Sequence, residues 1–351
     1  MSTHLELNNL NPNHRHIDFI DTAKGICILL VVLFHSNLIN INTPCLGMLR
    51  MPFYFTISGI FFKNYGGFIP TVLKKINRLI IPFSFFYIIS YLLYVLIRLI
   101  IDVEIDIPFF SFITSKVIVN VALWFLLALF WANVMFFTLT HFIHNTYKLA
   151  FYALLIGIVA LYVFNEHNYL PLYIDSGLAA LPFFSFGYLL KSTSILYSNR
   201  FDKYNILTII FLSIISYCLF IIGDKPYIGF GNIYKQGSVL CFYLGSVSTV
   251  IAIILLCKTV GTIPGIRYIG RYSIIILGFH VPISNCLKII MKHISPSLNP
   301  VMSNILLFGL TLSICIILIP ILTFYLPKLT AQKDLINVTY QIQKNSDNLI
   351  V

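Results

Sequence analysis

The stretch N304-I-L-L-F-G-L-T-L-S-I-C-I-I-L-I-P-I-L-T-F-Y-L-P327 contains no charged residue. A helix that crosses the hydrocarbon core of a bilayer, about 30 Å thick, needs roughly 20 largely apolar residues. A strand of a transmembrane β-barrel would instead alternate in polarity over about ten residues, and this stretch does not alternate. It therefore predicts a membrane-spanning helix.

The rest of the chain shares this character. Hydrophobic residues make up 58% of its 351 residues and charged residues only 10%, whereas soluble domains are about 25% charged. Such a chain cannot cover a water-facing surface of its own size. The composition therefore excludes a soluble globule, a disordered chain, a collagen and a disulfide scaffold.

Runs of similar length predict an all-α polytopic membrane protein with about ten transmembrane helices. The expected ranges are 19–40, 46–62, 79–101, 117–140, 149–165, 177–190, 206–223, 237–257, 272–291 and 303–326. We expect a transmembrane domain at 17–327, between an N-terminal segment at 1–16 and a tail at 328–351. The segment 1–16 is polar, so the first range is expected to be a retained helix rather than a signal peptide.

The net charge of +11 comes from 23 Lys and Arg against 12 Asp and Glu. No contiguous basic stretch supports a nucleic-acid-binding face. Basic residues instead gather after the second, fourth, sixth and eighth ranges and in the tail, whereas acidic residues gather in the opposite loops. By the positive-inside rule, both termini are expected to be cytoplasmic.

The seven cysteines form no C-x-x-C motif, and six lie inside the expected helices. They are expected to pack as small apolar residues, and no metal site or disulfide framework is predicted.

Ionisable residues inside membrane helices are costly and mark candidate sites. The first range reads D21-T-A-K24-G-I-C-I-L-L-V-V-L-F-H35. Eleven residues, at about 100° each, bring Lys24 and His35 to the same helix face, about 16 Å apart along the axis. Asp21, three residues before Lys24, is a neighbour that can pair with its ammonium. Snorkelling of Lys24 to the interface and a structural role for His35 are the plainer alternatives.

A second group lies in K74-K75-I-N-R78-L-I-I-P82, before the third expected helix. Lys75 and Arg78 lie one turn apart, and a guanidinium suits bidentate phosphate contacts. The alternative is an ordinary positive-inside anchor, to which Lys74 would also belong.

Three further polar or aromatic residues are candidates for substrate binding. His280 lies roughly 10 Å into the ninth expected helix, where a structural role is the alternative. Arg50 lies near the outer end of the second and either snorkels outward or faces a polar cavity. Trp124, near the outer end of the fourth, is either an interfacial tryptophan or part of a substrate cavity.

These residues resemble the membrane acyltransferase 3 family, and most closely its inner-membrane sugar O-acetyltransferase branch (fucose 4-O-acetylase-like proteins). That family begins with Arg or Lys, ten residues and then His, which here are Lys24 and His35. The further similar blocks are M51-P-F-Y-F-T-I-S58-G59, the pair Lys75 and Arg78 leading to Pro82, W124-F-L126, P182-F-F-S-F-G-Y-L-L-K191 and Y268-I-G-R-Y-S…H280.

The resemblance implies ten helices and transfer of an acyl group, usually acetyl, from cytoplasmic acetyl-CoA to a hydroxyl of a sugar or other envelope acceptor. It implies that His35 is catalytic, and we expect His35 to act as a general base or through a covalent acetyl-histidine. Lys24 and Asp21 are further catalytic candidates, but Lys24 lies too far along the helix to touch His35 and is expected to bind the donor or to pair with Asp21. Lys74, Lys75 and Arg78 are the implied donor-binding residues. Arg50, Trp124 and His280 are our candidates for binding the acceptor, a surface polysaccharide or a lipid-linked sugar.

The implied location is the bacterial inner membrane, where lipid surrounds the protein. No nucleic-acid partner is expected. A transporter or flippase of lipid-linked sugars is the main alternative, although such folds often show repeated halves and no repeat is found. A scaffold without chemistry does not account for Lys24 and His35 on one face.

Overall fold

The computed structural model describes residues 18–115, 117–165, 167–193, 196, 205–294 and 299–337. The expected N-terminal segment 1–16 and the tail beyond residue 337 lie outside the described residues. In chain order the elements are α1 (Asp18–His35), α2 (Leu46–Ile60), α3 (Phe68–Lys75), the π-helical turn η3 (Ile76–Ile80), α4 (Ile81–Ile100), the 3-10 turns η4 (Phe109–Thr114) and η5 (Val121–Leu123), α5 (Trp124–Phe142), α6 (Thr146–Val163), the 3-10 turn η6 (Pro171–Tyr173), α7 (Ile174–Lys191), α8 (Asn205–Ile222), β1 (Tyr227–Gly229), β2 (Tyr234–Gln236), α9 (Val239–Val260), α10 (Pro264–Arg271), α11 (Ser273–Ile294) and α12 (Pro300–Tyr325).

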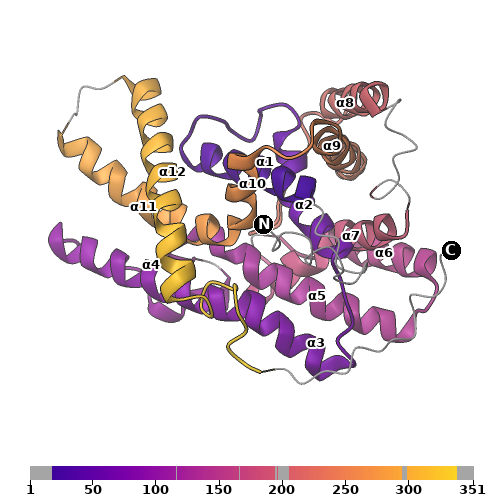
Figure 1. The fold of residues 1–351 in the computed structure, drawn as a ribbon, viewed down its shortest axis with the longest axis horizontal. Coiled ribbons are helices and arrows are strands. Elements are labelled where there is room, and N and C mark those ends of the chain that lie inside the picture. The colour runs from indigo at the N-terminus through magenta and orange to yellow at the C-terminus, as the bar shows by residue number, and fades with distance from the viewer. Residues whose placement is uncertain are drawn as a thin grey trace, which may run out of the picture.

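The helices form one bundle (Figure 1). Helices α4, α11 and α12 lie on one side and α6, α8 and α9 on the other, with α1, α2 and α5 between them. The outer helices expose large apolar side chains, among them Leu96, Phe151, Ile214 and Ile317. Exposed apolar faces of this kind are unfavourable in water and suit contact with lipid.

Each of the ten expected ranges contains a helix, so the prediction of a helical membrane protein is confirmed. Within the described residues, eight helices are long and apolar enough to cross a bilayer. The other two expected spans are α1, which carries Asp18, Asp21 and Lys24, and α2, which has 15 residues. The count of ten and the cytoplasmic position of both termini therefore stay predictions.

Two helices begin or end well inside their expected ranges, whereas the other differences are of one to three residues. Helix α1 stops at His35 rather than at residue 40, because Ser36 turns back to the carbonyl of Val32 at 2.9 Å and Asn37 adopts a left-handed φ of 58°. Helix α5 begins only at Trp124, after Asn120 has capped the preceding turn by accepting a hydrogen bond from the backbone of Ala122. His35 and Trp124 thus both lie at helix ends.

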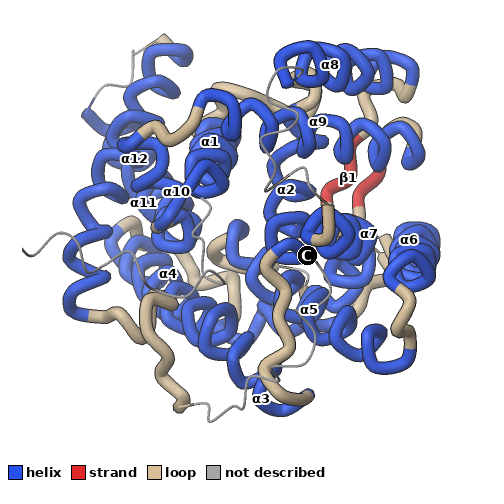
Figure 2. Tube along the Cα trace, turned by 45° about the vertical axis from the view of Figure 1, so that its right-hand side comes forward, coloured by secondary structure: helices blue, strands red, loops and turns tan. Residues whose placement is uncertain are grey.

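A small β-hairpin departs from the expected all-α fold. Strands β1 and β2 pair antiparallel, with Tyr227 opposite Gln236 and Gly229 opposite Tyr234. The hairpin contacts α2 and α9 (Figure 2), and Phe230 in its turn is buried. Alternating aromatic and aliphatic residues around a Gly-Phe-Gly-Asn turn are the signal that would have predicted it.

Glycines allow helices to touch where the site is built. A Cβ on Gly59 of α2 would lie 1.9 Å from the carbonyl oxygen of Phe184 in α7, and a Cβ on Gly187 of α7 would lie 1.9 Å from that of Thr56 in α2. Real side chains cannot approach so closely, so the two backbones contact each other directly. This contact holds α2, and with it Arg50, against the centre of the bundle.

We predict that Gly59→Ala destabilises the protein by about 1–3 kcal/mol, because the added methyl forces α2 and α7 apart. Gly309→Ala in α12 is the matched control, since nothing lies within 4 Å of its Cβ position and alanine favours a helix. Thermal unfolding in detergent measures both. Equal melting temperatures for the two variants would contradict the close contact.

Candidate active site

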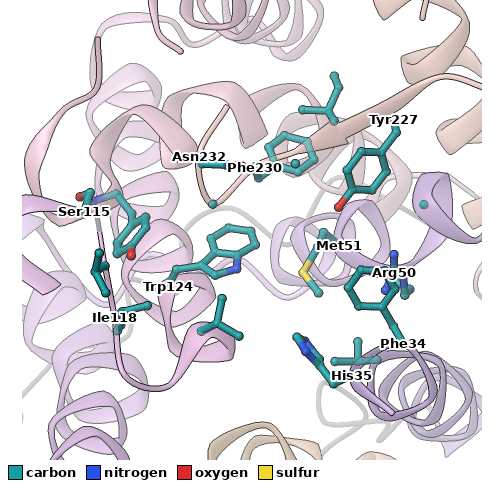
Figure 3. A pocket seen from close by; sticks show the side chains of 18 residues that line it. Phe34, His35, Arg50, Met51, Ser115, Ile118, Trp124, Tyr227, Phe230 and Asn232 are labelled. Atoms are coloured by element: carbon teal, nitrogen blue, oxygen red, sulfur yellow. The ribbon is translucent and has the colours of Figure 1, made fainter. Parts of the chain in front are cut away.

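A cavity of about 450 Å³ lies at the His35 end of α1 (Figure 3). Its wall comes from α1, α2, the segment 115–124, Tyr173 and the β-hairpin. Cavities of a few hundred Å³ with a few convergent polar groups are typical of small-molecule sites. The polar side chains in this wall are His35, Arg50, Ser115, Trp124, Tyr173, Tyr227 and Asn232.

His35 faces this cavity with a second histidine beside it. The rings of His35 and His280 lie 5.0 Å apart between centroids. His280 is completely buried in α11 and is not part of the cavity wall. It lies beside His35 instead of lining the cavity. Lys288, also in α11, donates to the backbone carbonyl of His35 at 3.4 Å.

The ring of His280 is fixed by its own helix. Its Nδ1 lies 2.9 Å from the carbonyl oxygen of Ile276 and 3.1 Å from that of Leu277. Because a carbonyl only accepts, Nδ1 carries the hydrogen and donates. Nε2 is then an acceptor, and it has no hydrogen-bond partner within the described residues. His280 is therefore suited to orient a neighbouring polar group.

Arg50 is buried in the same cavity wall, with only 5% of its surface exposed. Its guanidinium lies over the ring of Phe34, 3.9 Å from the ring centroid, and its Nε donates to the carbonyl of Leu46 at 3.3 Å. The side chain thus faces the cavity and does not snorkel outward. Tyr227 lies in the wall nearby, and burial raises the pKa of its phenol, so the hydroxyl stays protonated at neutral pH.

Trp124 forms the part of the wall that lies across the cavity from Arg50 and Tyr227 (Figure 3). Its ring lies 6.4 Å from that of Tyr173, and its indole packs so closely on the hairpin that a Cβ on Gly231 would lie 3.1 Å from Nε1. These contacts place Trp124 in the cavity wall. The aromatic rings present flat apolar surfaces beside polar groups.

The other end of α1 holds the predicted ion pair. Lys24 Nζ lies 3.0 Å from Asp21 Oδ1 and 5.5 Å from the centroid of the Phe61 ring. Tyr54 of α2 donates to the backbone carbonyl of Lys24 at 2.9 Å. Lys24 therefore does not reach His35, which lies eleven residues, or about 16 Å, further along the helix.

The basic group at residues 74–78 contacts the chain beyond α12. Lys74 lies 2.5 Å from Asp334, the Nε of Arg78 lies 3.6 Å from the same carboxylate, and Arg78 also donates to the carbonyl of Ala331. Lys75 extends instead over the ring of Phe62, 6.0 Å from its centroid. Lys74 and Arg78 thus share Asp334 as their acidic partner. Because Asp334 lies far from both in the sequence, no local pattern predicts this contact.

A π-helical turn shapes this group. Pro82 has no N–H to bond the carbonyl of Arg78, and such a break in the helical ladder favours an irregular turn. Asn77, completely buried in this turn, accepts hydrogen bonds from the backbones of Leu335 and Ile336 at 2.9 and 2.8 Å and donates to the carbonyl of Ile336 at 2.9 Å. Residues 331–336 are therefore held against the turn.

A second, smaller cavity of about 130 Å³ lies along α1 between its two ends. Ile28 of α1, Tyr54 of α2, Leu79 of η3 and Ser273 of α11 are in its wall. Met51 lines this cavity and the larger one as well. Met51 is thus common to the two walls, and Leu79 in the wall of the smaller cavity follows Arg78 in the π-helical turn.

The fold and these cavities define a polytopic helical membrane protein with a buried histidine site. The chain matches the family model Acyl_transf_3, described as an acyltransferase domain, over residues 17–320, and it therefore belongs to the acyltransferase 3 family. Family membership identifies it as a membrane acyltransferase. No curated protein and no solved structure matches the chain.

We predict that Asn77→Ala releases residues 331–336, because three hydrogen bonds are lost, each contributing about 0.5–1.5 kcal/mol. Limited trypsin digestion of the purified protein should then cut after Lys333 much faster than in wild type. Ser84→Ala is the matched control, since Ser84 is exposed and, within the described residues, its hydroxyl donates to the carbonyl of Ile80 at the end of η3. An unchanged rate in Asn77→Ala would exclude this docking.

Proposed function

We propose that the protein is an integral membrane O-acyltransferase of the bacterial inner membrane. It transfers an acetyl group from cytoplasmic acetyl-CoA to a hydroxyl of a cell-surface polysaccharide or a lipid-linked sugar, with His35 as general base. The observation that carries the proposal is His35 in the wall of a cavity of acceptor size, with a buried histidine beside it. Family membership supports acyl transfer as the chemistry.

The donor is proposed to bind along α1. Its phosphates lie at Lys75 and Arg78, with Lys74 beside them, and its pantetheine arm occupies the smaller cavity next to Ile28. Tyr54 and Ser273 supply polar atoms for its amides, and the adaptable side chain of Met51 moves to let the thioester reach His35. Lys24 and Asp21 then contribute charge beside the donor rather than at the reacting atoms.

In the proposed reaction, neutral His35 removes the proton of the acceptor hydroxyl while its oxygen attacks the thioester carbonyl. The tetrahedral intermediate collapses, the carbon–sulfur bond breaks, and the thiolate takes the proton from the imidazolium. The products are an O-acetyl ester and free coenzyme A. His280 acts as a positioning residue that holds the imidazole of His35, and a positioned base contributes about 10²–10⁴-fold to the rate.

His35→Ala should lower acetyl transfer by at least about 10²-fold, because the general base is lost, while the protein still folds in the membrane. His293→Ala is the control, since His293 is exposed and, among the described residues, its Nδ1 contacts the carbonyl of Ile289 in its own helix. The measurement is transfer of radiolabel from acetyl-CoA by purified protein. Transfer by His35→Ala at the rate of His293→Ala would refute the role of His35.

The same assay separates the remaining mechanisms. A covalent acetyl-His35 leaves label on wild-type protein in the absence of acceptor and none on His35→Ala, whereas direct transfer leaves both unlabelled. Movement of a lipid-linked sugar without any transfer of label would identify a flippase instead.

Lys75→Gln should raise the KM for acetyl-CoA by about tenfold with a smaller change in kcat, because one charge-assisted contact to phosphate is lost. Asp334→Asn should lower this KM, because Lys74 and Arg78 no longer share their charge with a carboxylate. Exposed Lys63 supplies the control variant Lys63→Gln. A donor site elsewhere would leave the KM unchanged in Lys75→Gln and Asp334→Asn.

A further inference from the structure

Among the described residues, the wall of the cavity at His35 carries a positive charge without an acidic partner. Its wall contains the guanidinium of Arg50 and no Asp or Glu among the described residues. Asp175 is a buried acid close in sequence to Tyr173 of this wall. Its carboxylate already accepts backbone hydrogen bonds from Ser176 at 2.8 Å and Leu170 at 3.4 Å.

Arg50 itself has no acidic partner within the described part of the chain. Its guanidinium contacts the ring of Phe34 there, and its Nε donates to the carbonyl of Leu46. Both terminal nitrogens of the guanidinium remain as donors. A buried charge without a counterion is strongly unfavourable, and in membrane helices such a charge marks a substrate site.

The geometry suits an anion more than a neutral hydroxyl. Stacking on Phe34 fixes the plane of the guanidinium, and its two terminal nitrogens then form a rigid fork that matches a carboxylate or phosphate. The protonated hydroxyl of Tyr227 lines the cavity nearby and can donate a further hydrogen bond. Figure 3 shows Arg50 and Tyr227 on one side of the space and Trp124 on the other, with His35 between them at its edge.

Resting on the proposed function, we propose that the acceptor is an acidic sugar substrate, and that Arg50 binds a carboxylate or phosphate group while His35 acts on a hydroxyl of the same sugar. Trp124 then provides the surface on which the sugar ring lies. The anion has two chemical sources, a carboxylate on the sugar itself or the phosphate that joins a sugar to a lipid carrier. In both cases Arg50 determines specificity and takes no part in the proton transfer.

The chain offers a direct probe of this binding. Its two tryptophans are Trp124, in the cavity wall, and Trp131, which does not line it. Trp131→Phe therefore leaves Trp124 as the only fluorescent tryptophan. Full-length Trp131→Phe protein in detergent is titrated with glucuronate, glucose 1-phosphate and glucose, which carry a carboxylate, a phosphate and no charge respectively.

We expect at least one of the two anions to change the Trp124 fluorescence with a Kd at least about tenfold below that of glucose, the effect of one charge-assisted contact. The tighter anion identifies the source of the charge. Adding Arg50→Gln should abolish the preference, and Arg50→Lys should keep part of it. Glucose binding as tightly as both anions, no response to either anion, or a preference that survives Arg50→Gln would overturn the proposal.

A donor titration separates this inference from the proposed function. Acetyl-CoA should bind to the Arg50→Gln protein as it binds to wild type, measured by equilibrium dialysis with labelled donor. Loss of donor binding would mean that Arg50 holds the phosphates of coenzyme A, and the acidic-acceptor inference would be wrong. Failure of acetyl transfer with intact anion binding would instead count against the proposed reaction alone.

Discussion

The length of α1 is the constraint on which the site depends. Its 18 residues span about 27 Å, close to the thickness of a hydrocarbon core, and it carries the pair Asp21 and Lys24 in its first half and His35 as its last residue. Direct backbone contact with α10, where a Cβ on Gly270 would lie 1.8 Å from the carbonyl oxygen of Asp21, holds the helix in position. A donor with its phosphates near the first end needs a long, thin arm to reach the second, and the pantetheine of coenzyme A has this shape.

The two ends of α1 manage their positive charge differently. At the Lys24 end, Asp21 pairs with Lys24, and Asp334 pairs with Lys74 and Arg78. At the His35 end, the described residues provide Arg50 with stacking and a single carbonyl but no carboxylate. The ion pairs of Lys24, Lys74 and Arg78 hold segments of the chain together. Arg50 has no acidic partner among the described residues, and in the proposed function an anionic ligand supplies its counterion. This difference is why the proposed donor end includes a docked segment of the chain and the proposed acceptor end is a cavity.

Most of the helical fold was predictable because length and hydrophobicity alone define a membrane helix. The exact ends were not, since a turn at Ser36 and a cap at Asn120 depend on single polar residues. The shared helix face predicted His35 as a site residue, but periodicity carries no information on which other helix approaches it. The contacts with His280, Tyr227 and Asp334 join residues far apart in the sequence, so they required the structure. The β-hairpin has a local turn signal, but its strands are too short to form a long apolar run.

The central claim is that donor and acceptor approach His35 from opposite ends of α1. It is tested most directly by a structure of the protein with a non-reactive acetyl-CoA analogue in which a methylene replaces the thioester sulfur. We expect the phosphates of the analogue to lie at Lys75 and Arg78 and its pantetheine arm beside Ile28 and Met51. Its acetyl group should lie next to His35, with the cavity beside Trp124 still open. Phosphates bound at Arg50, with the nucleotide filling the cavity beside Trp124, would contradict it.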